Sequence, residues 1–133
     1  ALRFARAGAR VVIAARSAEA LAELAAEIEQ LGGTATAVVA DTADAQQAQA
    51  VADRAVAEYG RIDTWVQLAA VTIFSPVSRM TPAEFKQVID VDLTGAIYGA
   101  LAALSHMRPA GRGALVFISS ILAKRAVPYQ SAY

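Results

Sequence analysis

Cysteine is absent from this sequence of 133 residues, which excludes disulfide bonds and thiolate metal sites. Histidine occurs once, at His106, so too few ligands remain for zinc and we expect no metal site. We interpret His106 as a partly exposed helical residue and not as a catalytic one. An excess of charge of either sign is also lacking, because twelve basic residues balance twelve acidic ones. Nothing in this balance favours a nucleic acid or an anionic membrane as a partner.

Long apolar runs are missing too. None approaches the roughly 20 residues of a membrane-spanning helix, and neither a signal peptide nor a targeting motif is visible. We therefore expect a cytoplasmic protein with no membrane partner. Hydrophobic residues nevertheless make up 56% of the chain and charged residues only 18%, which favours a buried core over disorder. The length suits one domain or a piece of one.

Four short apolar stretches, rich in β-branched residues, predict buried strands. They lie at 11–15, 34–40, 64–71 and 114–119. Helical patterns lie between them, and this alternation indicates βαβ units with right-handed crossovers. The predicted fold class is therefore α/β, with a doubly wound parallel sheet between two layers of helices. No linker or repeat interrupts the pattern, so we predict a single domain over residues 1–133.

Polar residues with a hydroxyl mark the starts of the helices. Ser17 is predicted to cap the helix that follows the first strand. Thr81–Glu84 combines a capping hydroxyl, a proline at the first helical position and a glutamate at the third. The helix that begins there is predicted to reach about Met107, with Gly95 and Gly99 inside it. Because each internal glycine costs about 1 kcal/mol relative to alanine, these two predict a helix face in close contact with another element.

The last predicted strand ends at two hydroxyls, Ser119 and Ser120. The carboxyl ends of parallel strands are where open α/β sheets bind ligands, so Ser120 is a candidate site residue. Tyr133 follows thirteen positions later. In isolation, however, a serine pair at this point is better explained as the cap of the next turn, and only the rest of the chain favours a site residue.

Further motifs agree with a known family in both order and spacing. They are Arg16 at the end of the first strand, Asp41 at the end of the second, Arg61-Ile62-Asp63 before the third, Val66-Gln67-Leu68-Ala69-Ala70, Val91-Asp92-Leu93-Thr94-Gly95, and the pair Ser120 and Tyr133. Over essentially its whole length the chain resembles the short-chain dehydrogenase/reductase family, whose motifs Val-Asn-Asn-Ala-Gly and Val-Asn-Leu-Thr-Gly stand at the two middle positions. The resemblance implies a partial Rossmann-type dinucleotide-binding domain.

The resemblance also implies an activity, namely hydride transfer between NADP(H) and a carbonyl or alcohol substrate. Tyr133 is then the general acid/base, and Ser120 orients the substrate oxygen. Asp92 stands where the family has an asparagine that distorts its helix and helps to hold a water in the proton relay. The family's Gly-rich turn would precede residue 1 and its catalytic lysine would follow Tyr133, so we expect a portion of a longer enzyme. A further strand is expected between those at Val11 and Thr64.

Arg16 determines which cofactor the resemblance predicts. NAD sites place an acidic residue near this position, whereas an arginine accommodates the 2′-phosphate of NADP, so we expect NADP(H) to be preferred over NAD(H). Asp41 is expected to accept a hydrogen bond from the adenine amino group. A surface arginine and a turn aspartate are the alternatives for these two residues. The complete set of expected cofactor-binding residues is Arg16, Ser17, Asp41, Thr42, Gln67, Ala69 and Ala70.

Partners and an alternative function complete the expectations. Relatives pair the helix at 93–107 across a two-fold axis, so we expect a homodimer or homotetramer. The predicted contact face shares helical spacing, at Tyr98, Leu101, Ala102 and Ser105. Ile121, Leu122 and Val127 after Ser120 favour a hydrophobic carbonyl substrate. Gln67, Leu68 and Asp92 depart from the family pattern, and they motivate the alternative of a catalytically weak or inactive binding or scaffold protein.

Overall fold

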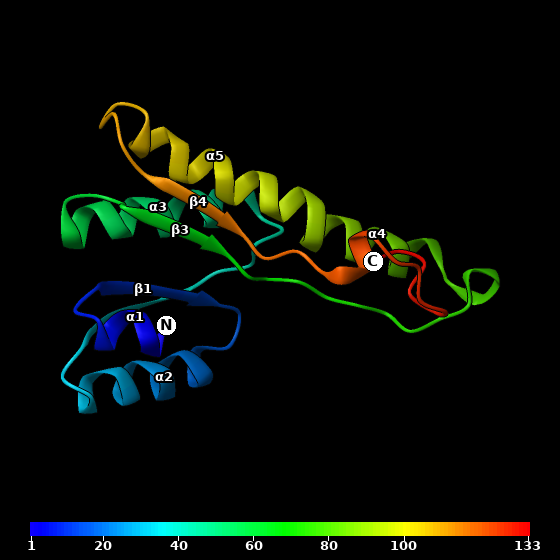
Figure 1. Ribbon diagram of the computed structural model, residues 1–133, viewed down its shortest axis with the longest axis horizontal. Coiled ribbons are helices and arrows are strands. Elements are labelled where there is room, and N and C mark those ends of the chain that lie inside the picture. Colours follow the sequence, from blue (N-terminus) through cyan, green and yellow to red (C-terminus); the bar gives the residue numbers. More distant parts are fainter.

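The computed structural model describes residues 1–133 and alternates helices with strands (Figure 1). In chain order the main elements are α1 (Leu2–Arg6), β1 (Arg10–Ala15), α2 (Ala18–Gln30), β2 (Thr34–Val39), α3 (Ala45–Tyr59), β3 (Thr64–Gln67), α4 (Pro82–Val88), α5 (Gly95–Met107) and β4 (Ala114–Phe117). Short 3-10 helices span Val77–Arg79 and Ile121–Ala123, and a π-helix spans Ile89–Thr94. The predicted alternation of strands and helices is confirmed.

The strands pair in parallel, as predicted. β1 pairs with β2 from Arg10 opposite Thr34 onward, and β3 pairs with β4 from Thr64 opposite Ala114 onward. The two pairs are separate two-stranded sheets. The sheet is therefore divided between β1 and β3, which is where the resemblance places a further strand.

Two of the predicted strands are too long by two residues or more. The third was expected to reach residue 71 but ends at Gln67, and the fourth was expected to reach residue 119 but ends at Phe117. The Ile118 N–H still donates to the Gln67 carbonyl at 3.1 Å, and beyond it the ladder stops. Leu68 is 65% exposed, so the apolar residues after β3 belong to a surface loop at the sheet edge. Composition alone does not separate such a loop from a buried strand.

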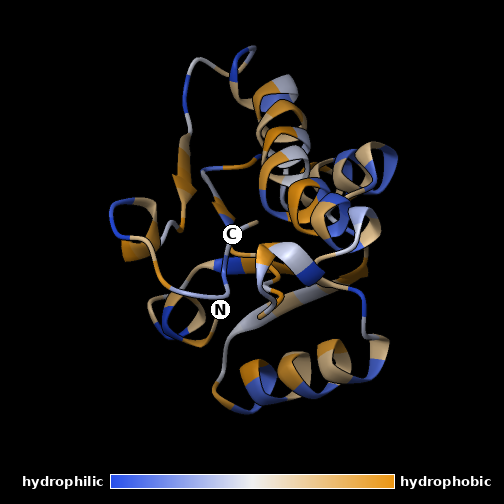
Figure 2. Ribbon diagram, turned by 90° about the vertical axis from the view of Figure 1, so that its right-hand side faces the viewer, coloured by the Kyte–Doolittle hydropathy of each residue, from blue (hydrophilic) through white to orange (hydrophobic).

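Two separate clusters of buried apolar side chains form the core. Beside the first sheet, Ala5, Ile13, Leu21 and Ile28 from α1, β1 and α2 form one cluster. Beside the second, Ala48 and Ala52 of α3 pack on Ala102 of α5. The helix at the bottom of Figure 2 is α2, and its hydrophilic residues lie mainly on the side away from the strands. Burial of one apolar stripe per helix thus fixes the layers on the strands.

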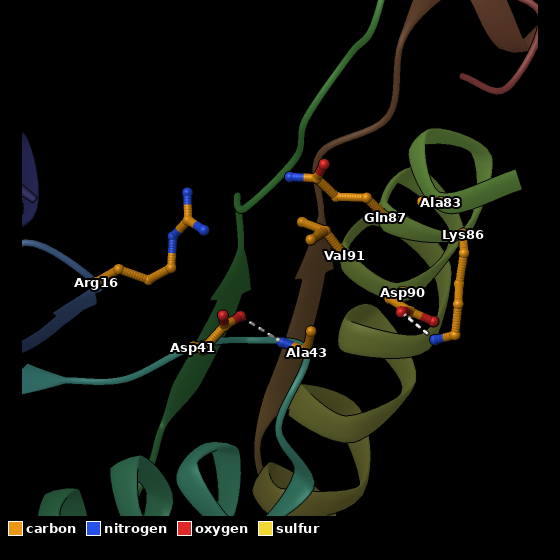
Figure 3. A pocket seen from close by; sticks show the side chains of 8 residues that line it. All are labelled: Arg16, Asp41, Ala43, Ala83, Lys86, Gln87, Asp90 and Val91. Atoms are coloured by element: carbon orange, nitrogen blue, oxygen red, sulfur yellow. Dashed lines mark hydrogen bonds and ion pairs between the residues drawn. The ribbon is translucent and has the colours of Figure 1, made fainter. Parts of the chain in front are cut away.

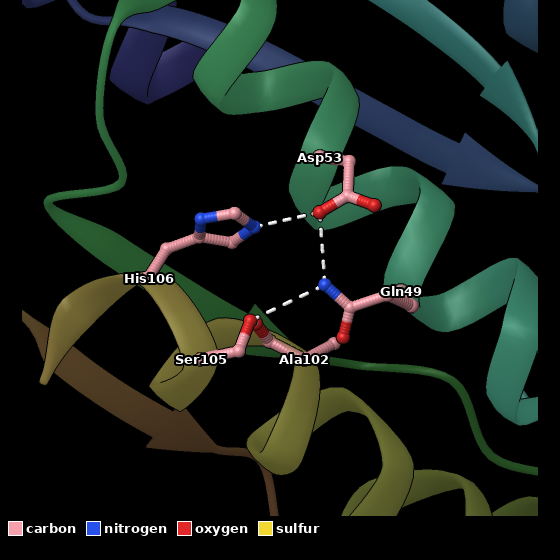
Figure 4. Close-up of polar contacts among 5 residues, drawn as sticks. All are labelled: Gln49, Asp53, Ala102, Ser105 and His106. Atoms are coloured by element: carbon pink, nitrogen blue, oxygen red, sulfur yellow. Dashed lines mark hydrogen bonds and ion pairs between the residues drawn. The ribbon is translucent and has the colours of Figure 1, made fainter. Parts of the chain in front are cut away.

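The contact between α3 and α5 includes a polar network (Figure 4). The Gln49 amide donates to Asp53 at 2.9 Å and to the Ser105 hydroxyl at 3.2 Å, while His106 Nε2 lies 2.7 Å from the Asp53 carboxylate.

The predicted oligomer face is therefore wrong in part. Ala102 is only 2% exposed because it packs on α3, and the exposed Ser105 accepts a hydrogen bond from Gln49 of α3. The interpretation of His106 as partly exposed is confirmed, with 29% of its side chain exposed.

The stretch from α4 to α5 is one long helical run with a distortion in the middle. Thr81 and Glu84 form the predicted capping box, with the Thr81 N–H donating to Glu84 at 2.7 Å. The backbone widens to a π-helix at Ile89–Thr94, so the helix is distorted at Asp92 as the resemblance implies. The whole run, Pro82–Ala110, is long and apolar enough to cross a membrane by length and composition. The sequence prediction missed this, but one such helix is weak evidence for a membrane.

Gly95 and Gly99 explain how closely this helix approaches its neighbours. A Cβ on Gly95 would lie 2.9 Å from the Thr42 carbonyl oxygen. A Cβ on Gly99 would lie 2.5 Å from Gln67 Oε1 and 3.0 Å from Trp65 Nε1. The predicted close contact is thus with β3 and with the loop after β2.

Candidate active site and cofactor site

An open pocket of about 270 Å³ lies at the carboxyl ends of β1 and β2, facing α4 and the π-helix (Figure 3). Arg16 and Asp41, which the sequence singles out, both line it. Its other lining residues are Ala43, Ala83, Lys86, Gln87, Asp90 and Val91. Since Arg16 and Asp41 come from different strands, the parallel pairing of β1 with β2 is what brings them to one pocket.

Arg16 directly follows the last residue of β1, and its guanidinium forms no hydrogen bond or ion pair in this structure. Figure 3 shows its side chain extended along the pocket, with the charged end free of the neighbouring labelled side chains. Ser17, the next residue, does form a hydrogen bond. Its hydroxyl oxygen accepts from the Ala20 N–H at 3.2 Å and caps α2, as predicted. The pocket therefore holds one unpaired cation beside a helix N-terminus.

Asp41 is held by its own turn. One carboxylate oxygen accepts from the Ala43 N–H at 2.9 Å, and the Asp41 N–H donates to Gln47 Oε1 at 2.8 Å. No hydrogen bond reaches the second carboxylate oxygen, which leaves an acceptor free at the pocket wall. Gln47 also bonds to Asp44, and hydrogen bonds from its backbone and side chain lower the pKa of Asp44. The turn interpretation of Asp41 is thus confirmed, and it is compatible with a ligand role for the free oxygen.

Thr42 and Gln67 are joined to each other. The Gln67 amide donates to the Thr42 hydroxyl at 3.0 Å, and the Trp65 indole donates to Gln67 Oε1 at 3.2 Å. The Thr42 hydroxyl donates in turn to the Gly95 carbonyl at 3.4 Å. Gln67 is 8% exposed, and its side-chain amide connects β3 to the loop after β2. Ala69 and Ala70, by contrast, are exposed in the loop that follows β3.

Asp92 connects the π-helix to that same loop. Its Oδ1 accepts from the Val71 N–H at 2.8 Å. Its Oδ2 is buried and has no hydrogen-bond partner within the chain. A buried carboxylate oxygen without a donor is costly, so this atom marks a place where a donor such as water is needed.

Ser120 and Tyr133 are not joined by a hydrogen bond. The Ser120 hydroxyl oxygen accepts from the Leu122 N–H at 3.1 Å and caps the 3-10 helix at Ile121–Ala123. The capping interpretation is therefore confirmed, although the hydroxyl proton is still free to be donated elsewhere. Tyr133 is 46% exposed. The predicted convergence of the two hydroxyls on a substrate oxygen stays a prediction.

The wall formed by α4 and the π-helix is what the sequence analysis missed. Lys86 and Asp90 form an ion pair across one helical turn, and Gln87 extends toward the side of the pocket on which Arg16 lies (Figure 3). A signal was available, because residues 83, 87, 90 and 91 share a helical face just before the Asp92 motif. Pattern alone gave no reason to place that face opposite Asp41.

The chain belongs to the short-chain dehydrogenase family, since the family model for short chain dehydrogenases matches residues 1–133. An uncharacterized oxidoreductase YxnA of Bacillus subtilis (strain 168) is 38% identical over 127 residues, which are 95% of this chain and 36% of that protein. The 3beta-hydroxysteroid dehydrogenase 1 of Eggerthella lenta is 39% identical over 107 residues, covering 80% of this chain and 41% of that protein. The chain thus spans half or less of the length of these relatives.

Solved structures agree on the Rossmann-type fold. A 7 alpha-hydroxysteroid dehydrogenase complexed with NADH and 7-oxo glycochenodeoxycholic acid matches 99% of this chain and 51% of its own, with a TM-score of 0.93 and 29% identity. A metagenomic short-chain oxidoreductase in complex with NADP matches 98% of this chain and 60% of its own, with a TM-score of 0.92 and 34% identity. The two neighbours hold different nicotinamide cofactors, so the fold by itself does not choose between them.

Proposed function

We propose that this chain forms part of an oxidoreductase that transfers a hydride between NADP(H) and a carbonyl or alcohol substrate. The observation that carries the proposal is the shared pocket of Arg16 and Asp41 at the carboxyl ends of two parallel strands. That edge is where doubly wound sheets bind dinucleotides. Relatives named as dehydrogenases support an enzymatic function, and none supports the scaffold alternative.

Arg16 is proposed to bind the 2′-phosphate of NADP. An unpaired guanidinium at the end of a strand is suited to a phosphate, because it offers several donors in one plane. The acidic residue that would bind a ribose 2′-hydroxyl is missing from the stretch Ala15–Ser17. The free oxygen of Asp41 is proposed to accept from the adenine amino group. Ser17, Thr42, Ala69 and Ala70 remain proposed contacts, whereas Gln67 is proposed to support the site by holding Thr42.

This assignment predicts a cofactor preference that titration can measure. The full-length protein should bind NADPH more tightly than NADH, and Arg16→Ala should weaken NADPH by about 10-fold or more, the usual loss for a charged hydrogen-bonding partner. NADH affinity should change little. Arg112→Ala, at an exposed arginine outside the pocket, is the matched control. Equal affinity of the unmodified protein for both cofactors would contradict the assignment.

The chemistry assigned to the remaining residues is the transfer of one proton and the orientation of the substrate oxygen. A bound nicotinamide supplies or accepts the hydride. Tyr133 is proposed to give or take the proton on the substrate oxygen, and Ser120 to donate a hydrogen bond that orients it. Asp92 is proposed to hold a water through its unpartnered Oδ2, whose burial calls for a donor there. Ile121 and Val127, 75% and 41% exposed, support an apolar substrate beside Ser120.

A second copy of the chain is the proposed partner. Leu93, Ile97 and Leu101 are 58%, 52% and 60% exposed and follow one another at four-residue spacing. This stripe shares only Leu101 with the face predicted from the sequence. An apolar stripe on a helix that other elements leave uncovered suits an isologous helix pair. We therefore retain the homo-oligomer proposal on these three residues.

A further inference from the structure

Tyr129 has a backbone conformation that tyrosine rarely adopts. Its φ is 68°, and it is the only residue other than glycine in the chain with a positive φ. It directly follows Pro128, and a proline followed by a residue with positive φ is typical of a type II turn, where the second residue is normally glycine or asparagine. Strain of this kind persists only where the surroundings impose it, and it concentrates near functional sites.

The surroundings that impose it belong to another loop. The Ser75 N–H donates to the Tyr129 carbonyl at 2.9 Å, and Ser75 and Gln130 form an isolated parallel bridge. The Gln130 amide also donates to the Thr72 hydroxyl at 3.3 Å. We call these contacts the 72–130 clamp. They join the loop after β3 to the segment that carries Tyr133, although more than fifty residues separate the two in sequence.

The same loop is held at its other end by Asp92. The Val71 N–H donates to Asp92 Oδ1, so residues 71–75 bond to the π-helix on one side and to Tyr129–Gln130 on the other. The Tyr129 side chain, in contrast, is 58% exposed and its hydroxyl has no hydrogen bond within the chain. The hydrogen bond that residue 129 makes within the chain is therefore a backbone one, and its turn lies four residues before Tyr133.

We propose that Tyr129 is a positioning residue, whose left-handed turn, fixed by the 72–130 clamp, sets the place of Tyr133 relative to Asp92. The inference rests on the proposed function of Tyr133 as the proton donor. It assigns the effect to the backbone of residue 129 and not to its ring. A residue that tolerates positive φ should then substitute for tyrosine, and a β-branched residue should not.

The test compares Tyr129→Gly with Tyr129→Val in the full-length protein. Tyr129→Gly should keep kcat within about 3-fold, while Tyr129→Val should lower kcat by about 10-fold or more, because small misplacements of catalytic groups are that costly. NADPH affinity should stay within about 2-fold in both, since neither Tyr129 nor the clamp residues line the pocket of Arg16 and Asp41. Wild-type kcat in Tyr129→Val, or an equal loss in both variants, would overturn the proposal. An unmodified protein without any reductase activity would instead overturn the proposed function.

A second pair of variants tests the clamp itself. Ser75→Pro removes the N–H that donates to Tyr129, whereas Ser75→Ala keeps it and removes only the hydroxyl. We expect a kcat loss in Ser75→Pro and near wild-type turnover in Ser75→Ala. Amide hydrogen exchange gives a readout without catalysis. The Ser75 amide should exchange at least 10-fold more slowly than in an unstructured chain, and faster in Tyr129→Val. Unprotected exchange at Ser75 in the unmodified protein would refute the clamp.

Discussion

At the scale of single residues, a side chain in the candidate site also holds neighbouring elements together. Gln67 departs from the family's asparagine, but its longer amide reaches Thr42 and lies against the bare backbone of Gly99. The missing side chain at residue 99 and the added methylene at residue 67 therefore compensate each other. This pairing predicts that alanine at residue 99 destabilises the protein, whereas helix propensity alone predicts that it stabilises it.

Gly99→Ala should lower the free energy of unfolding. Alanine gains about 1 kcal/mol over glycine in a helix interior, but overpacking costs about 1–3 kcal/mol. The new Cβ would meet Gln67 Oε1 at 2.5 Å and the less movable Trp65 ring at 3.0–3.2 Å, so overpacking should win. Urea denaturation measures the change. When Gln67 is also replaced by alanine, the destabilisation caused by Gly99→Ala should be smaller than in the otherwise unmodified protein. A higher urea midpoint for Gly99→Ala alone would show the packing argument to be wrong.

At the scale of elements, α3 and α5 are held together by small residues and by one polar network. Asp53 is its centre, and hydrogen bonds from Gln49 and then from His106 lower the pKa of this carboxyl. Its folded pKa lies below the unfolded value, so its contribution to stability is present above the unfolded pKa and is lost as the pH falls through the folded one. The side chain is 57% exposed, so the contribution is a small one.

Asp53→Asn should therefore flatten the acid limb of the stability profile. Between pH 5 and about pH 3 the unfolding midpoint of the unmodified protein should fall more than that of the variant, because asparagine has no proton to gain. Asp63→Asn, at an exposed carboxylate away from this contact, serves as the control. Identical acid limbs for Asp53→Asn and the unmodified protein would mean that the network contributes nothing measurable.

The elements also differ in how well the sequence predicts them. Strand positions, parallel pairing and the capping box at Thr81 were predictable, because they depend on local pattern. The end of β3 was not, since the apolar residues after Gln67 look the same in a strand and in a loop. The wall of the pocket formed by Gln87 and Asp90, and the left-handed turn at Tyr129, depend on tertiary contacts that no local pattern encodes.

At the scale of the whole molecule, the chain has two separate parallel sheets and one uncovered helix stripe. The predicted oligomer face was wrong in part, because helical spacing groups residues on one face but does not show which element that face contacts. Ala102 and Ser105 turned toward α3, and the neighbouring stripe was left exposed.

Ile97→Glu/Leu101→Glu should convert the proposed oligomer to a monomer, because paired copies would bury like charges against each other. Light scattering of the full-length protein at micromolar concentration measures the mass. Leu31→Glu adds a charge at an exposed leucine on the opposite part of the molecule and should leave the mass unchanged. An unmodified protein that is monomeric at that concentration would rule out this partner.

Turnover of Tyr133→Phe in the full-length protein tests the central claim most directly. The substitution removes only the acidic hydroxyl, so NADPH affinity should stay within about 2-fold while turnover falls by about 100-fold or more, the usual share of general acid–base catalysis. Ser120→Ala should act in the same direction, with a double-variant loss smaller than the product of the two, because the residues act as a unit. Full turnover in Tyr133→Phe would contradict the assignment of the proton to Tyr133.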